Sequence, residues 1–244
     1  MLELESRRYW FKTKKVWFSS YPFDVKGYHC VKFTDTKYKV DLAGFQMRSK
    51  TNLVIDLAQD LDTIWKKMSK SSTRRDIKRA QRAGVRVKLN EDYDEFQELN
   101  DSFRKKKGIY PDFEKTSVLK RSGPLFIAEY DGDILCGHAC FADGHTILGR
   151  LAASKRLVDR DRASLIGNAN KLLVWETIKY AKAKGLREFD LGRYYVKDGD
   201  LQEVGYSAWK KGFGGDLVER YDYTKYYSKI YELALMGANR LHRL

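Results

Sequence analysis

Two kinds of hydrophobic spacing follow one another along the chain. In the first 57 residues the apolar side chains gather in short runs rich in aromatic and β-branched residues, which predict strands over residues 16–18, 28–33 and 52–57. Over residues 61–68 the apolar positions instead recur at i, i+3, i+4 and i+7, the spacing of one helix face. The chain is therefore predicted to begin as a β region and to continue into a helix.

Helices and strands alternate more regularly after this point. The pattern predicts helices over residues 74–83, 93–106, 164–184 and 228–243, and strands over residues 85–89, 124–130, 134–142, 145–153, 188–191 and 218–227. Three antiparallel strands, a long helix and two later strands make an α+β order, which resembles the GNAT fold of N-acyltransferases. We therefore expect a GNAT-like mixed sheet flanked by helices.

The charge of the chain narrows the class of its partners. The sequence holds 47 Lys or Arg against 33 Asp or Glu, a net charge of +14. Such an excess favours a polyanionic partner, either nucleic acid, a phosphate-rich substrate or an anionic membrane surface. No apolar run is long enough to predict a transmembrane helix, and the N-terminus has no secretory pattern. Three cysteines are too few for a disulfide framework, so we expect a cytoplasmic protein.

Much of the positive charge lies between residues 66 and 88, where ten cations face a single Asp76. We assign four residues of this segment to the binding of a phosphate or polyanion, namely Arg74, Arg75, Lys78 and Arg79. Guanidinium groups hold phosphate oxygens in pairs, and a polyanion would relieve the repulsion between neighbouring cations. The alternative is a solvated basic face of a helix.

A second candidate is the glycine-rich segment Trp209-Lys210-Lys211-Gly212-Phe213-Gly214-Gly215. Two ammonium groups beside a glycine turn with free backbone N–H donors would stabilise an oxyanion or a phosphate. The segment has neither the order of a Walker loop nor that of a dinucleotide fingerprint. The alternative is an ordinary turn.

Three further segments are weaker candidates. Residues 164–169 lie where GNAT enzymes bind the CoA pyrophosphate, but the match is degenerate and an ordinary helix start is the alternative. Cys136, His138 and Cys140 alternate along one strand, which indicates a buried core and no metal site. The final helix carries Ile230 and Leu233 beside cations, so it either docks on the body of the protein or makes a peripheral membrane contact.

Residues 72–85, 170–192 and 209–215 together resemble the FemAB/FemX family of tRNA-dependent aminoacyl transferases, which build peptidoglycan cross-bridges, and the wider FemAB-like acyltransferases. The first segment is similar to the family's basic helix, with the pattern Arg-x-x-Ile-Lys-x-Ala-x-x-x-Gly-Val over residues 74–85. The second is similar to its central helix and following strand. The third is similar to its Phe-Lys-x-Gly-Phe-Gly signature, with Trp209 in place of the first aromatic residue.

The resemblance implies two GNAT-like halves, here residues 1–90 as a truncated half and residues 91–244 as the acyltransferase half, packed as one unit. It also implies that an acceptor amine attacks an activated acyl carbonyl directly, with Lys210 stabilising the tetrahedral intermediate. Trp209 would line one side of the site, and Asp190 and Tyr194 would lie near it. The other residues that we assign to substrate are Arg150, Asn170, Trp175 and Lys211.

Three functions remain open on the sequence. The first is an N-acyl or aminoacyl transferase that uses aminoacyl-tRNA, and the second is an N-acyltransferase that uses acyl-CoA or an acyl carrier protein. The third is a non-catalytic nucleic-acid-binding protein on a GNAT-like scaffold, although no known nucleic-acid-binding motif supports it. In the first two the acyl donor is a co-substrate, and no metal or tightly bound cofactor is expected.

Overall fold

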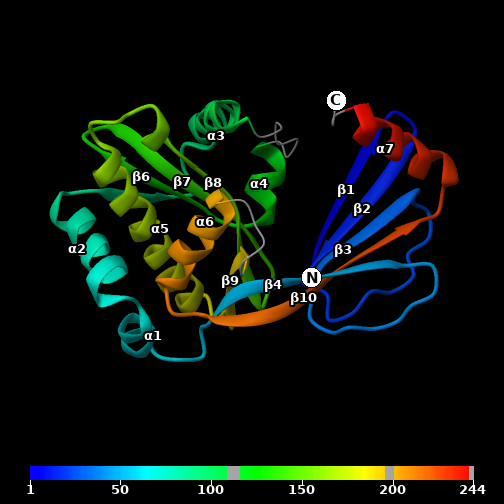
Figure 1. The fold of residues 1–244 in the computed structure, drawn as a ribbon, viewed down its shortest axis with the longest axis horizontal. Coiled ribbons are helices and arrows are strands. Elements are labelled where there is room, and N and C mark those ends of the chain that lie inside the picture. Colours follow the sequence, from blue (N-terminus) through cyan, green and yellow to red (C-terminus); the bar gives the residue numbers. More distant parts are fainter. Residues whose placement is uncertain (109–115, 196–200, 242–244) are drawn as a thin grey trace. The chain divides into compact units, whose positions relative to one another are not determined.

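The computed structural model describes residues 1–108, 116–195 and 201–241, and these residues form two compact units (Figure 1). Unit 1 consists of Met1–Thr51 and Val218–Leu244, and unit 2 consists of Asn52–Leu217. The chain passes from one unit to the other within two long strands, β4 (Gln46–Asp56) and β10 (Asp216–Tyr226). These units do not coincide with the division near residue 90 that the family resemblance implies, because the C-terminal segment returns to join the N-terminal strands.

A mixed sheet forms the centre of unit 2. Its strands run in the order β4-β9-β8-β7-β6-β5. The strands that follow β4 along the chain are β5 (Arg86–Leu89), β6 (Leu125–Tyr130), β7 (Asp133–Ala142), β8 (Thr146–Ser154) and β9 (Glu188–Arg193). The pair β8–β9 is parallel and the other described pairs are antiparallel. This arrangement confirms the GNAT-like mixed sheet.

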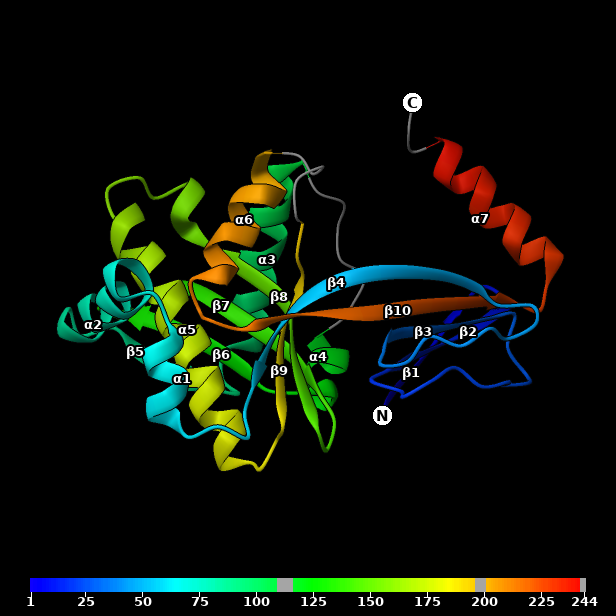
Figure 2. The same ribbon diagram turned by 60° about the horizontal axis from the view of Figure 1, so that its bottom comes forward.

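Helices cover both faces of this sheet (Figures 1 and 2). The helical elements of unit 2 are α1 (Leu61–Lys67), the π-helical turn η1 (Lys70–Arg74), α2 (Arg75–Arg82), α3 (Tyr93–Lys107), α4 (Thr116–Ser122), the short 3-10 helix η2 (Lys155–Leu157), α5 (Ala163–Ala183) and α6 (Leu201–Lys211). Helix α5 packs on the face that carries Phe126 and Cys136, and α2 packs on α5. The opposite face carries Gly137, where an added Cβ would lie 2.5 Å from the ring of Phe96 in α3. Alternate residues of each strand thus face two helical layers.

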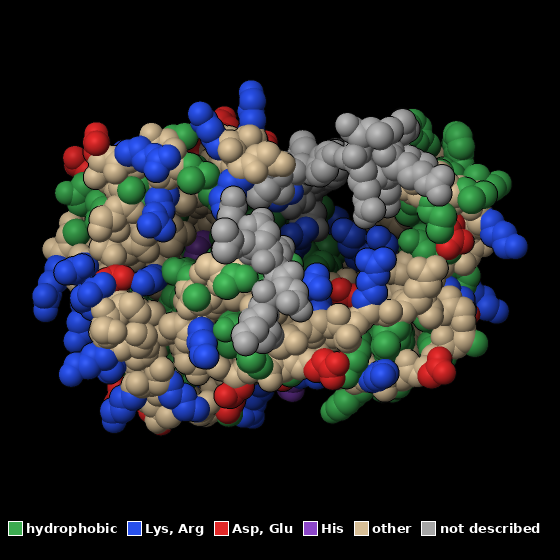
Figure 3. Space-filling model, viewed as in Figure 1, with side chains coloured by type: hydrophobic (Ala, Val, Ile, Leu, Met, Phe, Trp, Pro, Cys, Tyr) green, Lys and Arg blue, Asp and Glu red, His purple; other side chains and the backbone are tan. Residues whose placement is uncertain are grey.

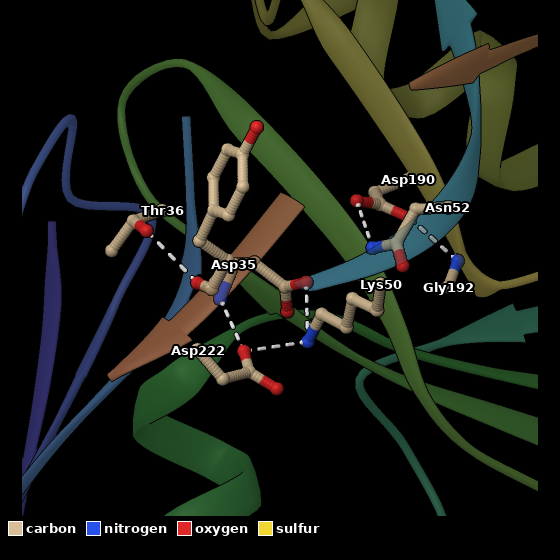
Figure 4. A network of polar contacts seen from close by, with 8 residues as sticks. Asp35, Thr36, Lys50, Asn52, Asp190, Gly192 and Asp222 are labelled. Atoms are coloured by element: carbon tan, nitrogen blue, oxygen red, sulfur yellow. Dashed lines mark hydrogen bonds and ion pairs between the residues drawn. The ribbon is translucent and has the colours of Figure 1, made fainter. Parts of the chain in front are cut away.

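The described part of unit 1 contains four strands, the first residues of β4 and one helix. The strands are β1 (Leu2–Arg8), β2 (Phe11–Trp17), β3 (Cys30–Thr36) and β10, in the order β1-β2-β3-β10. The helix α7 (Lys229–Leu241) follows β10. A buried ion cluster joins the strands, because the Lys50 ammonium lies 2.7 Å from Asp35 and 2.8 Å from Asp222 (Figure 4). Neighbouring aromatic rings, among them Phe33 and Tyr223, fill the core of this unit.

Most of the elements predicted from the sequence are present within a residue or two. Five elements were missed, namely β1, η1, α4, η2 and α6. Strands β2 and β4 begin five and six residues earlier than predicted. The largest difference is at α6, because Trp209, Lys210 and Lys211 form the end of a helix rather than part of a turn. None of the helices that the structure describes is long and apolar enough to cross a lipid bilayer.

Candidate functional site

Lys210 lies in the last turn of α6, with only 4% of its surface exposed. Its Nζ donates a 2.8 Å hydrogen bond to the backbone carbonyl oxygen of Arg193, at the end of β9. Gly192 turns the chain there with a φ of +78°, and a Cβ at this position would lie 3.7 Å from the Lys210 Nζ. The ring of Tyr206, one helical turn earlier in α6, lies 4.4 Å from the same nitrogen. The ammonium is therefore fixed between the end of a central strand and an aromatic ring.

Asp190 supplies the negative charge beside this lysine. Its buried carboxylate accepts a 2.8 Å hydrogen bond from the side-chain amide of Asn52 and a 2.6 Å hydrogen bond from the backbone N–H of Gly192 (Figure 4). Both donors favour the ionised carboxylate. Asn52 was not identified from the sequence, and its only signal is a polar residue next to the apolar run 53–55. The carboxylate of Asp190 is thus held by protein groups within unit 2.

Burial and the neighbouring carboxylate act in opposite directions on Lys210. Burial lowers the pKa of Lys210 from its ordinary value of 10.5 to about 8, and the charge of Asp190 opposes this fall. At neutral pH most molecules therefore carry a positive ammonium in a site with little water. A cation in such a place is suited to stabilise negative charge that develops on a reacting oxygen.

Aromatic residues form one side of this site. The ring of Trp209 stacks on Tyr206 with a centroid distance of 5.5 Å and an interplanar angle of 9°, and it meets Phe213 edge-on at 5.0 Å. Tyr194 is partly buried against the core of unit 2. The buried hydroxyl of Ser207 accepts a 2.9 Å hydrogen bond from the backbone N–H of Tyr195, which ties α6 to the residues after β9. Lys210 and Trp209 thus come from α6, and Asp190 comes from β9, which Tyr194 directly follows.

The glycines after Lys211 have a structural role, and the expectation of free backbone donors in this turn is wrong. The N–H groups of Gly212, Phe213 and Gly214 donate to the carbonyl oxygens of Trp209, Lys210 and Lys211, as at an ordinary helix end. The glycines instead allow close approach of backbone. A Cβ at Gly214, where φ is +77°, would lie 2.5 Å from the carbonyl oxygen of Lys67, and a Cβ at Gly215 would lie 2.7 Å from that of Val54.

The glycine turn after Lys211 also holds the basic segment, residues 66–88, against α6. The N–H of Ser69 donates a 2.9 Å hydrogen bond to the carbonyl oxygen of Gly212. The buried side chain of Thr73 approaches Gly212 so closely that an added Cβ would lie 2.5 Å from its hydroxyl oxygen. Arg74 follows Thr73 directly, so the placement of the first arginine of the segment depends on contact with the end of α6.

The cations of this segment surround a cavity of about 430 Å³, which we call the basic cavity. Its lining residues are Trp65, Lys70, Arg74, Arg75, Lys78, Arg79 and Arg82. None of the lining residues is acidic. Asp76 pairs with two of them and with a lysine of α5, since it lies 2.7 Å from Lys171, 3.0 Å from Arg75 and 3.9 Å from Arg79. Two of the lining arginines are therefore partly neutralised.

The side chains of the other four cations of the basic cavity have no ion-pair or hydrogen-bond partner among the described residues; these cations are Lys70, Arg74, Lys78 and Arg82. The Nε of Arg74 is buried and lacks a hydrogen-bond acceptor in the described part of the chain. A buried donor without an acceptor is costly, and like charges repel each other. A bound anion would remove both costs. Figure 3 shows Lys and Arg side chains gathered at this side of unit 2.

The remaining sequence candidates lie in other surroundings. Asn170 donates to the carbonyl oxygen of Ile166, and its side-chain oxygen lies 3.2 Å from Nε2 of His138. Burial lowers the pKa of His138 to about 4, although the bond to Asn170 opposes this. The guanidinium of Arg150 lies 5.7 Å from the ring of Phe141. Asn170 and Arg150 therefore contact groups of the protein interior.

Trp175, Lys211 and two of the cysteines are the other residues singled out from the sequence. Trp175 packs against Trp65 with a centroid distance of 4.8 Å, which supports the side of the basic cavity. Lys211 is exposed at the end of α6. Cys136 and Cys140 are buried in the core, and burial raises the pKa of both thiols. Within residues 1–108, 116–195 and 201–241, no group of three His, Cys, Asp or Glu side chains is placed to hold a metal ion.

Comparison with known proteins identifies the class. The acetyltransferase (GNAT) domain family matches residues 67–211, which is more than half of the chain and contains both the basic cavity and Lys210. The chain therefore belongs to this family and is an acyltransferase. The FemAB/FemX resemblance of its sequence is matched in the fold, since a solved structure of FemX shares that fold over most of this chain. Among curated proteins no sequence matches the chain.

Three solved structures share the fold at low sequence identity. The crystal structure of FemX is 15% identical, with a TM-score of 0.65 over 84% of this chain and 74% of FemX. The C-terminal domain of a putative lysylphosphatidylglycerol synthetase from Agrobacterium fabrum is 16% identical, with a TM-score of 0.57 over 87% of this chain and 72% of that one. L-PGS from Bacillus licheniformis is 14% identical, with a TM-score of 0.55 over 88% and 73%.

Proposed function

We propose that this protein is an N-acyl or aminoacyl transferase in which the ammonium of Lys210 stabilises the oxyanion of the tetrahedral intermediate. The observation that carries the proposal is the buried Lys210 Nζ, held by the Arg193 carbonyl beside the charge of Asp190. A fixed cation at a developing oxyanion lowers the barrier by about 3–4 kcal/mol. Trp209 and Tyr194 would border the reacting groups, and Asp190 would act as a positioning residue for the lysine.

The reaction runs by direct attack. The lone pair of the acceptor amine forms a bond to the acyl carbon, and the carbonyl electrons move onto the oxygen, where the Lys210 ammonium opposes their charge. Collapse of this intermediate breaks the bond to the donor, which leaves as a hydroxyl or a thiol. The amine proton passes to the leaving group or to solvent. No acyl group is attached to the enzyme at any stage.

The basic cavity supports a donor that carries phosphate, and we place aminoacyl-tRNA first. Four cations without partners in the described residues, among them Arg74 and Lys78, suit a chain of phosphates better than a single carboxylate. Arg75 and Arg79 would also contact the phosphates. Asp76 neutralises them only in part, because it also pairs with Lys171. The assignment of Arg150, Asn170, Trp175 and Lys211 to substrate binding belongs to this proposal. The contacts described for the first three are with groups of the protein, and Lys211 is exposed.

A second candidate is an N-acyltransferase that uses acyl-CoA or an acyl carrier protein. The CoA pyrophosphate and the acidic surface of a carrier protein would also be attracted by the basic cavity. The third candidate, a non-catalytic nucleic-acid-binding protein, is disfavoured by the buried Lys210 site, which has no role in binding a nucleic-acid backbone. A cytoplasmic location belongs to the same proposal, because three free cysteines suit a reducing compartment.

The experiment that separates these candidates offers charged tRNA, acetyl-CoA and acyl carrier protein in parallel, each with a mixture of primary amines. Loss of the aminoacyl group from tRNA, dependent on Lys210, is the expected result. Turnover of acetyl-CoA alone would contradict the tRNA donor and leave acyl transfer in place. If no acyl donor is consumed while tRNA still binds, the protein is a nucleic-acid-binding member of the fold.

A further inference from the structure

Unit 1 exposes large aromatic side chains at the tip of its first hairpin. Strands β1 and β2 are joined through Tyr9 and Trp10, whose side chains are 76% and 68% exposed. Tyr9 has a φ of +54°, a conformation rarely adopted outside glycine, so the turn is built to a specific shape. Two adjacent exposed rings offer apolar surface with a polar edge, the kind of side chain that collects at the boundary between lipid and water.

An exposed apolar face of α7 adjoins this tip. Ile230 and Leu233 are 72% and 68% exposed, and Met236 is exposed one further step along the same side of the helix. The helix is attached to the rest of unit 1 through Tyr231, whose ring lies 4.9 Å from that of Phe11, the residue after Trp10. Helix α7 therefore contacts the unit through Tyr231 and leaves its apolar face uncovered by the described residues. We call Tyr9, Trp10, Ile230, Leu233 and Met236 the apolar rim, and Figure 3 shows green side chains gathered over α7.

The charge of unit 1 indicates what covers this rim. The unit holds 16 Lys or Arg against 8 Asp or Glu, so more than half of the net charge of the chain lies in about a third of its residues. Arg7 precedes the aromatic tip and Lys229 begins α7, and both are exposed without an ion-pair partner among the described residues. A second copy of the chain would bring the same positive charge to the interface and would be repelled. An anionic surface would be attracted.

We propose that the apolar rim docks unit 1 onto the surface of an anionic lipid bilayer. The rings of Tyr9 and Trp10 would enter the headgroup region, and the exposed face of α7 would lie in the same plane with Lys229 near the lipid phosphates. Neither contribution is sufficient alone, since a few apolar side chains or a few cations give only marginal, reversible binding. The inference rests on apolar side chains and cations lying together on one side of unit 1. It does not depend on the reaction in unit 2.

Vesicle binding tests the proposal on the full chain. Vesicles of phosphatidylcholine with about 30% phosphatidylglycerol would be compared with pure phosphatidylcholine vesicles in a flotation assay. We expect binding to the anionic vesicles that weakens as salt is raised, and little binding to the neutral ones. The double variant Ile230→Asp with Leu233→Asp should weaken binding about tenfold or more, and Trp10→Ser should weaken it to a smaller extent.

Two controls keep the result specific to the rim. Val158→Asp changes an apolar residue of unit 2 that is 52% exposed, as Met236 of the rim is, and should leave vesicle binding unchanged. Arg74→Ala with Lys78→Ala removes two cations from the basic cavity and should also leave it unchanged, while far-ultraviolet circular dichroism verifies that every variant is folded. The proposal is overturned if the wild-type chain fails to bind anionic vesicles at low salt, or if either control weakens binding as much as the rim variant. It is equally overturned if the rim variant changes the molecular mass in solution, because the rim would then be a contact between copies.

Discussion

The Lys210 ammonium and the Asp190 carboxylate belong to one connected arrangement, although 19 residues separate them in the sequence. Lys210 donates to the Arg193 carbonyl, and Asp190 is fixed by the N–H of Gly192 and the amide of Asn52. The end of β9 therefore positions both charged groups, since residues 190–193 supply the carboxylate, the turn and the acceptor. The predictions for the proposed reaction follow from this arrangement.

Replacement of Lys210 by methionine should separate catalysis from stability. Without the ammonium the rate of acyl transfer should fall by about 10²–10³-fold, as for the loss of an oxyanion donor. The free energy of unfolding should stay the same or rise, because a buried charge is replaced by an apolar side chain of similar length. Steady-state rates and urea unfolding of the same preparations check both parts. Near wild-type turnover by Lys210→Met would remove Lys210 from the mechanism.

The rate should also depend on pH through the charge of Lys210. The pKa of Lys210 is lowered to about 8, so kcat/KM should fall above this pH with the slope of a single proton loss. A pH–rate profile between pH 6 and 10 measures this limb, and a profile that stays flat over this range would contradict the need for an ammonium.

The free energy of unfolding should rise over the pH range in which the rate falls. Below pH 8 both the folded and the unfolded chain hold the Lys210 proton, and the folded state bears the full cost of the buried charge. Between about pH 8 and 10.5 the folded state releases this proton while the unfolded state keeps it, so the free energy of unfolding rises. The total gain is about 3 kcal/mol for a lowering from 10.5 to about 8. Unfolding measured against Lys210→Met isolates this gain, since other groups cancel in the difference.

Asp190→Asn should move the alkaline limb of the rate profile to lower pH. The carboxylate opposes the lowering of the Lys210 pKa, so its loss lets burial lower that pKa further. The matched control is Glu188→Gln, which removes the same charge from the same strand. The limb should shift for Asp190→Asn and remain in place for Glu188→Gln. Equal shifts in both variants would mean that only the overall charge matters.

Gly214→Ala should destabilise the fold by about 2 kcal/mol or more. The new Cβ would meet the Lys67 carbonyl oxygen at 2.5 Å, and the φ of +77° is itself unfavourable for alanine. Gly205→Ala is the control, because it lies in α6 with no atom within 4 Å of the added Cβ. This substitution should be neutral or stabilising by about 0.5–1 kcal/mol. Thermal or urea unfolding should therefore show a loss of stability for Gly214→Ala and none for Gly205→Ala.

Arg74→Ala with Lys78→Ala should weaken the binding of tRNA and reduce its dependence on salt. If both cations contact phosphates, the slope of log affinity against log salt should become shallower by about 2. The control is Lys179→Ala with Lys184→Ala, which removes the same charge from α5 and from the residue that follows it. Fluorescence anisotropy at several salt concentrations measures both slopes. A control that loses as much affinity would assign the binding to overall charge instead of the basic cavity.

Sequence spacing predicted most of the helices and strands because their apolar faces repeat with a regular period. Helix α6 was missed since Gly205 interrupts a mixed segment, and its helical form depends on the inward contacts of Ser207 and Lys210. Strand β1 was missed because only Leu2 and Leu4 among its seven residues are apolar, and a strand at the edge of a sheet tolerates so many charged residues.

The candidate site was predictable in its residue types and less so in its geometry. The sequence placed the excess of cations in residues 66–88, but it could not show that Lys171, from the distant α5, would share Asp76 with Arg75. It likewise gave no indication that Asn52 would reach Asp190, because that bond joins strands 138 residues apart. Roles that depend on contacts between distant segments require the structure.

The π-helical turn η1 imposes a limit on how this chain can vary. The N–H of Arg74 bonds to the carbonyl oxygen of Ser69, five residues earlier, so the turn holds one residue more than an α-helical turn. Deletion of a single residue there would rotate every later side chain of α2 by about 100° around the helix axis. The arginines would leave the basic cavity while the apolar residues of α2 left the core. The number of residues between Ser69, whose N–H is fixed on the Gly212 carbonyl, and Ile77, which is fixed in the core, is therefore as constrained as any side chain in the segment.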